Sequence, residues 1–221
     1  MFIPERDISR PLSGYPFVLI TIIAANIAVF LAEVVYGNSF VLRYSLKPAE
    51  IVRGEHLETL ITSMFMHANL IHIAGNMLYL WVFGDELEAN YLGAARFAVF
   101  YFMCGLAASV LQIAVDPAST VPNLGASGAI AGILAGFLLI FPRDEILVLI
   151  LTPFGIGHTR FSALIWIGLW FGLQIVGGFG TITSAATGGV AYFAHIGGFV
   201  AGAILVRIVG TGRRPVGQIR V

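Results

Sequence analysis

Charged side chains are scarce in this sequence of 221 residues: only 11% are Asp, Glu, Lys or Arg, while 58% are hydrophobic. Soluble domains carry roughly a quarter charged residues. A chain with about half that charge has too little polar surface to cover a soluble globule, so the composition excludes a soluble protein and indicates one embedded in a lipid bilayer. The formal net charge is +0, and nothing in this balance indicates a nucleic-acid partner.

Three further absences narrow the organisation of the chain. The single cysteine, Cys104, excludes an internal disulfide, and its place within an apolar run predicts a small buried side chain. The first apolar run is long enough to span a bilayer and has no small-residue cleavage site after a short core, so it is not a cleavable signal peptide. No linker, low-complexity tract or clear internal repeat divides the chain, so residues 1–221 are predicted to form one membrane domain.

Long uncharged apolar stretches are what the sequence has in abundance. About 20 apolar residues cross the hydrocarbon core as a helix, and each of these stretches is long enough for one crossing. The longest, Phe161 to Val206, is long enough for two and divides at the Gly- and Thr-rich segment 177–189, which predicts a turn. The sequence therefore predicts an all-α membrane protein, a bundle of six transmembrane helices near residues 14–36, 59–83, 94–115, 124–141, 159–178 and 189–209.

Basic residues give the predicted orientation, because cytoplasmic loops are enriched in Lys and Arg. With both termini in the cytoplasm, the basic residues outside all fall in the loop 37–58, whose mixture of apolar and charged residues predicts a segment at the membrane interface. The stretch Glu145 to Gly157 is too short to cross and is predicted to form a hairpin at the inner face. The simplest location is a prokaryotic cytoplasmic membrane. Arg43, Lys47 and Arg53 then lie outside, and Arg6, Arg10, Arg96, Arg143, Arg160, Arg207, Arg213, Arg214 and Arg220 lie inside.

Polar side chains within predicted spans mark functional hypotheses, because each costs several kcal/mol in a bilayer unless it is paired. The second span contains His67, His72 and Asn76. His72 and Asn76 are four residues apart and share one helix face, so both can donate hydrogen bonds to one point. The alternative interpretation is hydrogen bonding between helices that holds the bundle together.

A small-residue segment, Gly125-Ala126-Ser127-Gly128, lies at the outer end of the fourth span. Its small side chains let another group approach the Ser127 hydroxyl closely. Gly128, Gly132 and Gly136 then follow at intervals of four on one helix face, a spacing that permits close helix contact. Packing alone is the alternative interpretation. The pattern is not the nucleophile elbow of soluble hydrolases, because no strand precedes the serine.

His195 is the only side chain between Phe161 and Val206 that titrates near neutral pH. His195, Gly198 and Gly202 lie at i, i+3 and i+7, so the imidazole projects from the face where another helix can come closest. A buried, hydrogen-bonded structural histidine is the alternative.

The second, fourth and sixth spans all start at the outer face, which gives the polar residues a common depth and favours a joint chemical site. A serine hydroxyl needs an adjacent base to act as a nucleophile, and an imidazole supplies one near neutral pH. Ser127 is therefore predicted to be the nucleophile and His195 the base. The side chains of His72 and Asn76, with the Ser127 backbone amide, are the predicted donors to the oxyanion.

Two other kinds of site are disfavoured by missing residues. A triad requires a carboxylate that orients the imidazole, but no Asp or Glu lies within the later spans, and only Asp116, in an outer loop, could come near. A Ser-His dyad is therefore predicted. A zinc site is disfavoured because there is no His-Glu-x-x-His motif, and His67 and His72, five residues apart, splay around a helix. No metal or other cofactor is predicted.

Four segments in this order resemble the rhomboid family of intramembrane serine proteases. Each segment is only moderately specific, but the ordered set covers most of the chain and is highly specific. The segments are Thr62-Ser63-Met64-Phe65-Met66-His67 leading to His72-x-x-x-Asn76, then Phe83-Gly84-Asp85-Glu86-Leu87-Glu88, Gly125-Ala126-Ser127-Gly128 and Ala194-His195-Ile196-Gly197-Gly198.

The resemblance implies a six-helix bundle with a water-filled cavity open to the extracytoplasmic side. It implies the same roles for the polar residues: Ser127 and His195 catalytic, His72 and Asn76 stabilising the oxyanion, and His67 structural beside the cavity. It also implies single-span membrane proteins as substrates, cut near the outer membrane face where their helices are easily unwound.

The resemblance assigns further parts as well. Glu88 would tie the inner helix ends together. The fifth span and the segment 177–189 would be the substrate gate and lid, with the aromatic residues Trp166, Trp170 and Phe171 on that span.

The sequence departs from the family pattern in two places. Many relatives carry Trp-Arg in the first loop where this chain has Glu58-Thr59. Some relatives place an aromatic residue four positions after the serine, stacked on the histidine, where this chain has Ala131. Another side chain must then hold His195, either Tyr192 or an aromatic residue of a neighbouring helix.

Three rival interpretations remain at the sequence level. A rhomboid-like protein could bind membrane-protein clients without cutting them, although loss of the serine or histidine would signal this and both are present. A small transporter or channel lacks support, because the charged or broken-helix ion sites of transporters and an internal two-fold repeat are missing. A purely structural bundle leaves the four matching segments unexplained.

Overall fold

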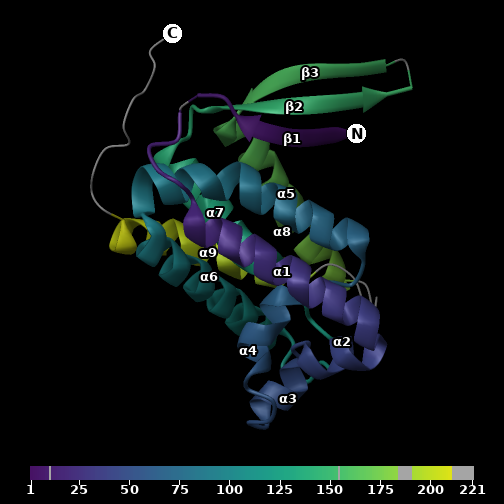
Figure 1. The fold of residues 1–221 in the computed structure, drawn as a ribbon. Coiled ribbons are helices and arrows are strands. Elements are labelled where there is room, and N and C mark those ends of the chain that lie inside the picture. Colours follow the sequence, from purple (N-terminus) through teal and green to yellow (C-terminus); the bar gives the residue numbers. More distant parts are fainter. Residues whose placement is uncertain (10, 154, 184–190, 211–221) are drawn as a thin grey trace.

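A computed structural model of the chain describes residues 1–9, 11–153, 155–183 and 191–210 (Figure 1). The described residues are mostly helical, with strands at one end. The strands are β1 (Phe2–Asp7), β2 (Glu145–Thr152) and β3 (Gly155–Ser162). The helices are α1 (Phe17–Tyr36), α2 (Asn38–Tyr44), α3 (Pro48–Val52), α4 (Thr59–Thr62), α5 (Leu70–Glu86), α6 (Ala94–Val115), α7 (Ser127–Ile140), α8 (Ala163–Thr183) and α9 (Tyr192–Val209), with a 3₁₀ turn η1 (Ser63–Phe65) and a π-helical segment η2 (Leu87–Leu92).

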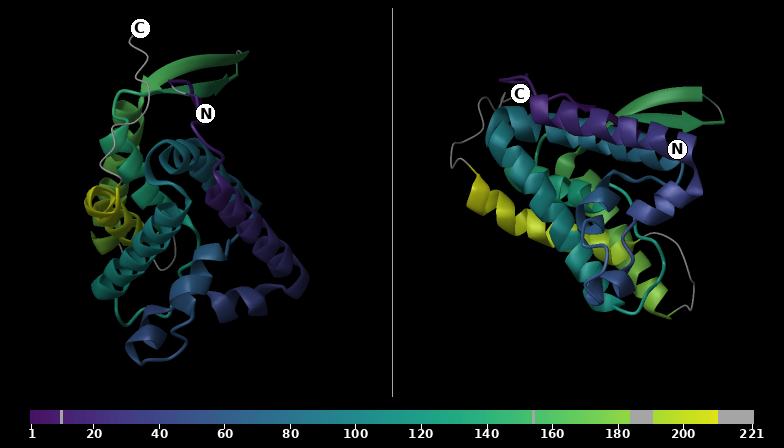
Figure 2. Two further views of the ribbon diagram at one scale, coloured as in Figure 1. Left: turned by 60° about the vertical axis from the view of Figure 1, so that its left-hand side comes forward. Right: turned by 60° about the horizontal axis from the view of Figure 1, so that its bottom comes forward.

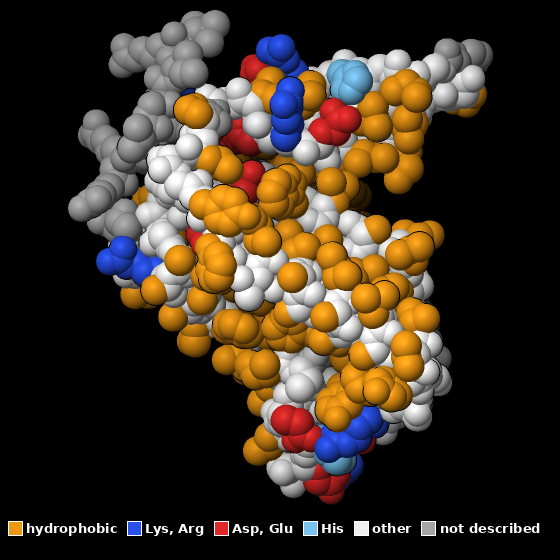
Figure 3. Space-filling model, viewed as in Figure 1, with side chains coloured by type: hydrophobic (Ala, Val, Ile, Leu, Met, Phe, Trp, Pro, Cys, Tyr) orange, Lys and Arg blue, Asp and Glu red, His pale blue; other side chains and the backbone are white. Residues whose placement is uncertain are grey.

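Each of the six predicted spans overlaps one helix, and in chain order these helices are α1, α5, α6, α7, α8 and α9. By length and composition α1, α6 and α9 suffice to cross a membrane, and α7 and residues 163–178 of α8 form shorter apolar helices. Large apolar side chains such as Leu31, Val110 and Leu169 are exposed on outward faces, and apolar side chains cover much of the surface between the two ends (Figure 3). A soluble protein would not expose so much apolar surface. The chain is therefore a mostly helical membrane protein.

The short helix α7 lies at the centre of the bundle. Every residue from Gly128 to Phe137 is buried, and α5, α6 and α9 all pack against this helix. The glycine spacing has the predicted effect, since a Cβ on Gly198 would overlap the Gly128 carbonyl oxygen and one on Gly202 would overlap that of Gly132. α7 and α9 are thus in backbone contact. Cys104 is fully buried, as predicted.

The prediction of an all-α protein was wrong, because β1, β2 and β3 form an antiparallel sheet in that order. The predicted hairpin near 145–157 is present and extends to Ser162. Ile146 and Val148 of β2 are buried in alternation, the pattern of a half-buried strand. The first strand was missed because its partner lies far along the chain: Phe2 pairs with Ile150.

The second span begins later than predicted. Instead of a helix from residue 59, the chain forms α4 and η1, turns extended at Met66, and starts α5 at Leu70. Asn69 decides this start, because its side-chain oxygen accepts a hydrogen bond from the His72 backbone N–H at 2.9 Å, the usual role of an N-cap residue. His67 therefore lies before α5 rather than within it.

The fifth span is also shifted. Its predicted start near residue 159 falls in β3, and α8 begins at Ala163. The predicted turn after Gly177 is wrong, because α8 continues to Thr183. The glycines serve packing here, since a Cβ on Gly177 would overlap the ring of Tyr192 and Gly178 faces Ile196. The rest of the predicted lid, residues 184–190, lies outside the described residues, and so does the predicted start of the sixth span at 189–190.

The two ends of the bundle differ. The sheet and the N-terminus lie at one end and α2 and α3 at the other, while α1 runs beside α5 (Figures 1 and 2). At the sheet end Glu88 is buried and accepts hydrogen bonds from the backbone N–H groups of Val18 at 3.0 Å and Leu19 at 2.7 Å. Glu88 thus ties η2 to the start of α1, as the resemblance implies, and its negative charge suits a helix N-terminus.

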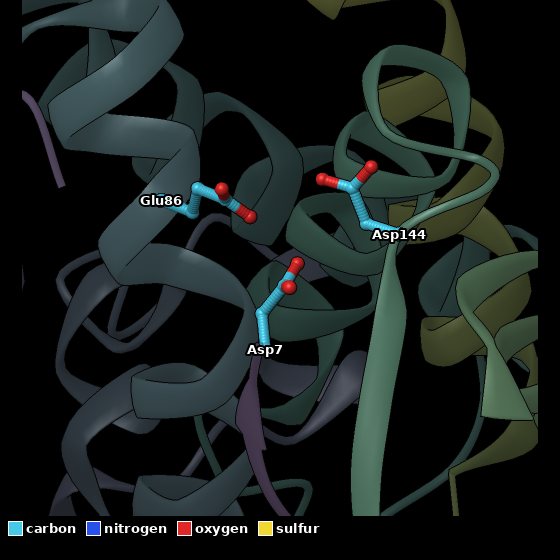
Figure 4. A group of neighbouring side chains, drawn as sticks. All are labelled: Asp7, Glu86 and Asp144. Carbon is cyan, nitrogen blue, oxygen red and sulfur yellow. The ribbon is translucent and has the colours of Figure 1, made fainter. Parts of the chain in front are cut away.

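Three carboxyl groups from separate segments also converge at the sheet end. Asp7 of β1, Glu86 of α5 and Asp144, which precedes β2, point toward one another (Figure 4), with one oxygen of each within 4.8 Å of the others. They gather at the C-terminal ends of α5 and α7. His72, in the first turn of α5, and Ser127, the first residue of α7, lie at the opposite ends of these helices, which for α7 is a separation of about 20 Å.

Candidate active site

Ser127 is the first residue of α7, and the loop before it approaches α5 closely. Gly125 has φ +120°, a conformation that favours glycine. A Cβ at this position would lie 2.9 Å from both Cε1 and Nε2 of His72. The Gly125 N–H donates to the Ser63 carbonyl oxygen at 2.9 Å. Only glycine therefore allows the backbone at position 125 to lie against the His72 ring, with Ser127 at the start of α7.

His195 lies in the first turn of α9 and faces Ser127. The Ser127 Oγ and His195 Nε2 atoms are 2.7 Å apart, within hydrogen-bond distance. The imidazole is buried, with 8% of the residue exposed. The contact between Gly128 and Gly198 brings the two helices close enough for these side chains to meet.

The other ring nitrogen of His195 contacts Gln174 of α8, which the sequence analysis missed. His195 Nδ1 lies 2.7 Å from Gln174 Oε1. The Gln174 amide nitrogen donates to the Trp170 carbonyl oxygen at 3.3 Å, so the amide oxygen is the atom that faces the ring. An amide oxygen only accepts, so Nδ1 carries the hydrogen and Nε2 accepts from the Ser127 hydroxyl. Asp116, the one acid expected to come near, is exposed at the end of α6.

An aromatic side chain of a neighbouring helix lies against His195. The rings of Trp170 and His195 have centroids 5.8 Å apart with an interplanar angle of 39°. Ala131 is fully buried, and Tyr192 packs on Gly177 instead. Of the two alternatives left open by the sequence, the structure therefore has the aromatic residue from another helix.

His72 and Asn76 project from α5 toward the same point. The Ala68 backbone N–H approaches His72 Nδ1 at 3.4 Å, which leaves the hydrogen on Nε2, the atom that faces Gly125. A Cβ at Gly125 would also lie 3.5 Å from Asn76 Nδ2. Both side chains thus present N–H groups beside the loop that carries Ser127.

His67 and Glu33 form a chain of hydrogen bonds that holds the Asn76 side chain in place. Asn76 Nδ2 lies 2.9 Å from His67 Nε2, and His67 Nδ1 lies 3.2 Å from the Phe65 carbonyl oxygen. A carbonyl accepts, so Nδ1 donates and Nε2 accepts one Asn76 amide hydrogen, which leaves the second available. The His67 backbone N–H in turn donates to the buried Glu33 of α1 at 2.9 Å.

Two of these supporting residues carried a signal in the sequence. Glu33 is an acid within the first span, and Gln174 is the only amide side chain between Phe161 and Val206. A carboxylate is the usual orienting group of a catalytic histidine, so an amide such as Gln174 is not singled out by residue type alone.

A pocket reaches Ser127 from the end of the bundle that carries α2 and α3. Ser63, Gln112 and Asn123 are among the polar residues that line it, together with Gly125 and the first turn of α7. His72, Asn76 and His195 do not line this pocket.

On α8, Phe171 stacks on Phe199 of α9 with centroids 3.9 Å apart, and Trp166 packs near Phe161. The predicted gate helix is therefore held to α9 partly by aromatic contacts.

Comparison with known proteins identifies the family. Residues 54–212 match the Rhomboid domain, a range that contains Ser127, His195, His72, Asn76 and Gln174. The chain belongs to the rhomboid family.

Known rhomboid proteins are similar over much of this chain. Rhomboid protein 1, mitochondrial, of Saccharomyces cerevisiae is 29% identical over 83% of this chain and 50% of its own length. Rhomboid protease GluP of Bacillus subtilis is 28% identical over 87% of this chain and 36% of its own. The human presenilin-associated rhomboid-like protein, mitochondrial, is 33% identical over 60% of this chain and 35% of its own. This rhomboid thus spans half or less of the length of these relatives.

Proposed function

We propose that this rhomboid is an intramembrane serine endopeptidase that hydrolyses peptide bonds of single-span membrane proteins with a Ser127–His195 dyad. The observation that carries the proposal is the 2.7 Å separation of Ser127 Oγ and His195 Nε2. A second support is the hydrogen on His195 Nδ1 required by Gln174 Oε1, because it leaves Nε2 as a base. Similarity to Rhomboid protease GluP agrees with this chemistry.

The dyad would act as follows. His195 Nε2 takes the Ser127 hydroxyl proton while Oγ attacks the carbonyl carbon of the substrate, forming a tetrahedral intermediate. The intermediate collapses to an acyl-enzyme as His195 gives that proton to the leaving amine. A water molecule then attacks the ester with His195 again as base, which releases the carboxyl product and restores Ser127. None of these steps requires a metal or an organic cofactor.

The negative oxygen of the intermediate needs donors that are already in place. The His72 Nε2–H and the second Asn76 amide hydrogen lie beside Gly125, two residues before the nucleophile, and the Ser127 backbone N–H at the start of α7 is a third candidate. Fixed donors in a site shielded from bulk water stabilise such charge more than water does. These three groups are the proposed oxyanion hole.

The bilayer and the substrate complete the proposal. Arg6, Arg143 and Arg160 belong to the sheet end, while Arg43 and Lys47 belong to the end with α2. We place the sheet end on the cytoplasmic side of a prokaryotic membrane and the dyad near the outer face of that membrane. A transmembrane segment of a substrate would then approach beside α8 and unwind at the level of Ser127. Residues 1–221 would act as one membrane domain.

The test uses the full chain, purified in detergent and incubated with a single-span substrate labelled on both sides of its membrane segment. Ser127→Ala and His195→Ala are expected to reduce cleavage to the uncatalysed background, because the dyad acts as a unit. A fluorophosphonate should label the native chain and not Ser127→Ala. Ser39→Ala in α2 and His158→Ala in β3 are matched controls of the same residue types, and both should cleave at the native rate.

Melting temperatures of all four variants would show that each remains folded. Cleavage by Ser127→Ala at the native rate would overturn the proposal. Substrate binding by the native chain with neither cleavage nor labelling would instead identify a rhomboid that binds membrane proteins without cutting them.

A further inference from the structure

Two groups that hold the His195 imidazole come from one turn of one helix. Gln174 Oε1 lies 2.7 Å from Nδ1, and the Trp170 ring lies over the imidazole at 5.8 Å between centroids. Trp170 and Gln174 are four residues apart and joined by the hydrogen bond from the Gln174 amide to the Trp170 carbonyl. α8 thus presents a paired acceptor and ring to the proposed base.

The helix that carries this pair is at the edge of the bundle. Leu164, Leu169 and Val176 are 58%, 64% and 70% exposed. A Cβ on Gly168 or Gly172 would have no described atom within 4 Å outside the helix itself. By contrast, α7 is buried along most of its length. Ser127 therefore stands on the most enclosed helix, whereas the partner of His195 Nδ1 stands on a peripheral one.

We propose that Gln174 is the positioning residue of the dyad, and that the reactivity of Ser127 therefore depends on α8 being seated against α9. This inference rests on the proposed function. With α8 seated, the Gln174 oxygen selects the imidazole tautomer that has its hydrogen on Nδ1 and a bare Nε2. With α8 displaced, Nδ1 loses this acceptor, the other tautomer becomes populated, and the ring loses the Trp170 contact as well.

A neutral acceptor suits this buried position. A buried carboxylate would lose its hydration, and its attraction to an imidazolium would offset that cost only in part. An amide oxygen carries no charge and accepts the Nδ1–H hydrogen bond through its dipole. His72, a titratable side chain of α5, lies against Gly125 in the loop before Ser127. The groups that face His195 from α7 and α8, namely Ser127, Trp170 and Gln174, are uncharged.

Three variants of the full chain test the inference. Gln174→Met keeps the length of the side chain but removes the acceptor, and it should lower kcat roughly 10- to 100-fold with KM changed less than about 3-fold. This loss is smaller than the ~10⁴-fold effect of replacing a charged orienting residue in a soluble triad. Gln174→Glu keeps an acceptor and should retain more activity, with the acidic limb of its pH–rate profile moved to higher pH because a carboxylate favours the imidazolium. Leu173→Met, a neighbouring exposed position with the same residue introduced, is the control and should match the native chain.

Labelling by a small fluorophosphonate separates positioning of the dyad from admission of the substrate. The probe needs the Ser127 nucleophile but no transmembrane segment, so Gln174→Met should slow labelling by a factor close to its loss in kcat. If Gln174→Met cleaves more slowly but is labelled at the native rate, Gln174 acts on substrate entry and the inference is overturned. Native kcat and an unchanged pH profile in both Gln174 variants would also overturn it, and Ser127-dependent cleavage by the native chain would leave the proposed function standing.

Discussion

Gly198 of α9 lies so close to the Gly128 carbonyl of α7 that a methyl group at position 198 would overlap that oxygen. This contact sets the spacing of the helices that carry Ser127 and His195. Gly198→Ala should therefore push α9 away from α7, destabilise the protein by about 1–3 kcal/mol through overpacking and reduce cleavage at least 10-fold. Thermal unfolding in detergent and the cleavage assay measure the two effects.

The matched control for this prediction is Gly172→Ala. Gly172 is also a helical glycine, but a Cβ there would have no described atom within 4 Å. Alanine favours a helix over glycine by up to about 1 kcal/mol, so this variant should melt at the native temperature or above it. If Gly198→Ala behaves like Gly172→Ala in both measurements, backbone contact does not set the geometry of the dyad.

The two histidines before and within α5 should separate into a stability role and a catalytic role. His72 is partly exposed and presents Nε2 at Gly125, whereas His67 is 1% exposed and holds Asn76. His72→Ala should lower kcat about 10²–10³-fold, the usual cost of one oxyanion donor, with little change in KM or melting temperature. His67→Ala should lower the melting temperature instead, because it leaves the buried Asn76 amide short of a partner.

Asn76→Ala should show both effects, since this side chain contacts His67 and also lies beside the proposed oxyanion position. Measured kcat, KM and melting temperature for the three variants form the test. A drop in melting temperature without loss of kcat for His72→Ala would remove that residue from the oxyanion hole.

Glu88 should matter for stability and not for chemistry. Its two carboxylate oxygens accept from Val18 and Leu19 at the start of α1, and the residue is 1% exposed. Glu88→Ala leaves the buried N–H of Leu19 and the partly buried N–H of Val18 without this acceptor, and should destabilise the protein by about 1–3 kcal/mol. Once folded, the variant should cleave with native kcat. Glu145→Ala, which removes an exposed ion pair with Arg160, should leave the melting temperature nearly unchanged. Equal shifts for the two variants would contradict the capping role of Glu88.

The acidic cluster at the sheet end predicts a dependence of stability on pH. Burial raises the pKa of Asp7 in β1 above its ordinary value of 3.8. A carboxyl group with a raised pKa in the folded state stabilises the fold fully below the unfolded-state pKa, and this contribution is lost as the pH rises through the folded-state pKa. Asp7→Asn, which stays neutral, should therefore melt at a higher temperature than the native chain at pH 7.

The difference between Asp7→Asn and the native chain should shrink as the pH is lowered and Asp7 itself becomes protonated. Melting curves across a series of pH values would measure it. Glu5→Gln, on the same strand and beside His158, is the control and should show a much smaller difference. A destabilised Asp7→Asn variant at pH 7 would mean that the Asp7 charge is favourable in the folded protein.

The amino-acid sequence alone was sufficient to predict the membrane class, the approximate positions of the main helices and the approach of Ser127 to His195. These features follow from local properties: the length of uncharged runs, the four-residue spacing of Gly128 and Gly132, and the rarity of polar side chains within them. Even the third span was predicted with the bounds of α6. The length of a helix and the spacing of residues along it depend on neighbouring residues in the chain, so they can be predicted from the sequence without knowing how the helices pack.

Other features depended on contacts between segments distant in the chain, and only the tertiary structure shows them. β1 exists because Phe2 pairs with Ile150, and α8 continues through Gly177, which packs against the ring of Tyr192. The partner of His195 Nδ1 is an amide on α8 rather than Asp116. An acceptor for that nitrogen could come from any neighbouring helix, and which one supplies it is determined by how the helices pack.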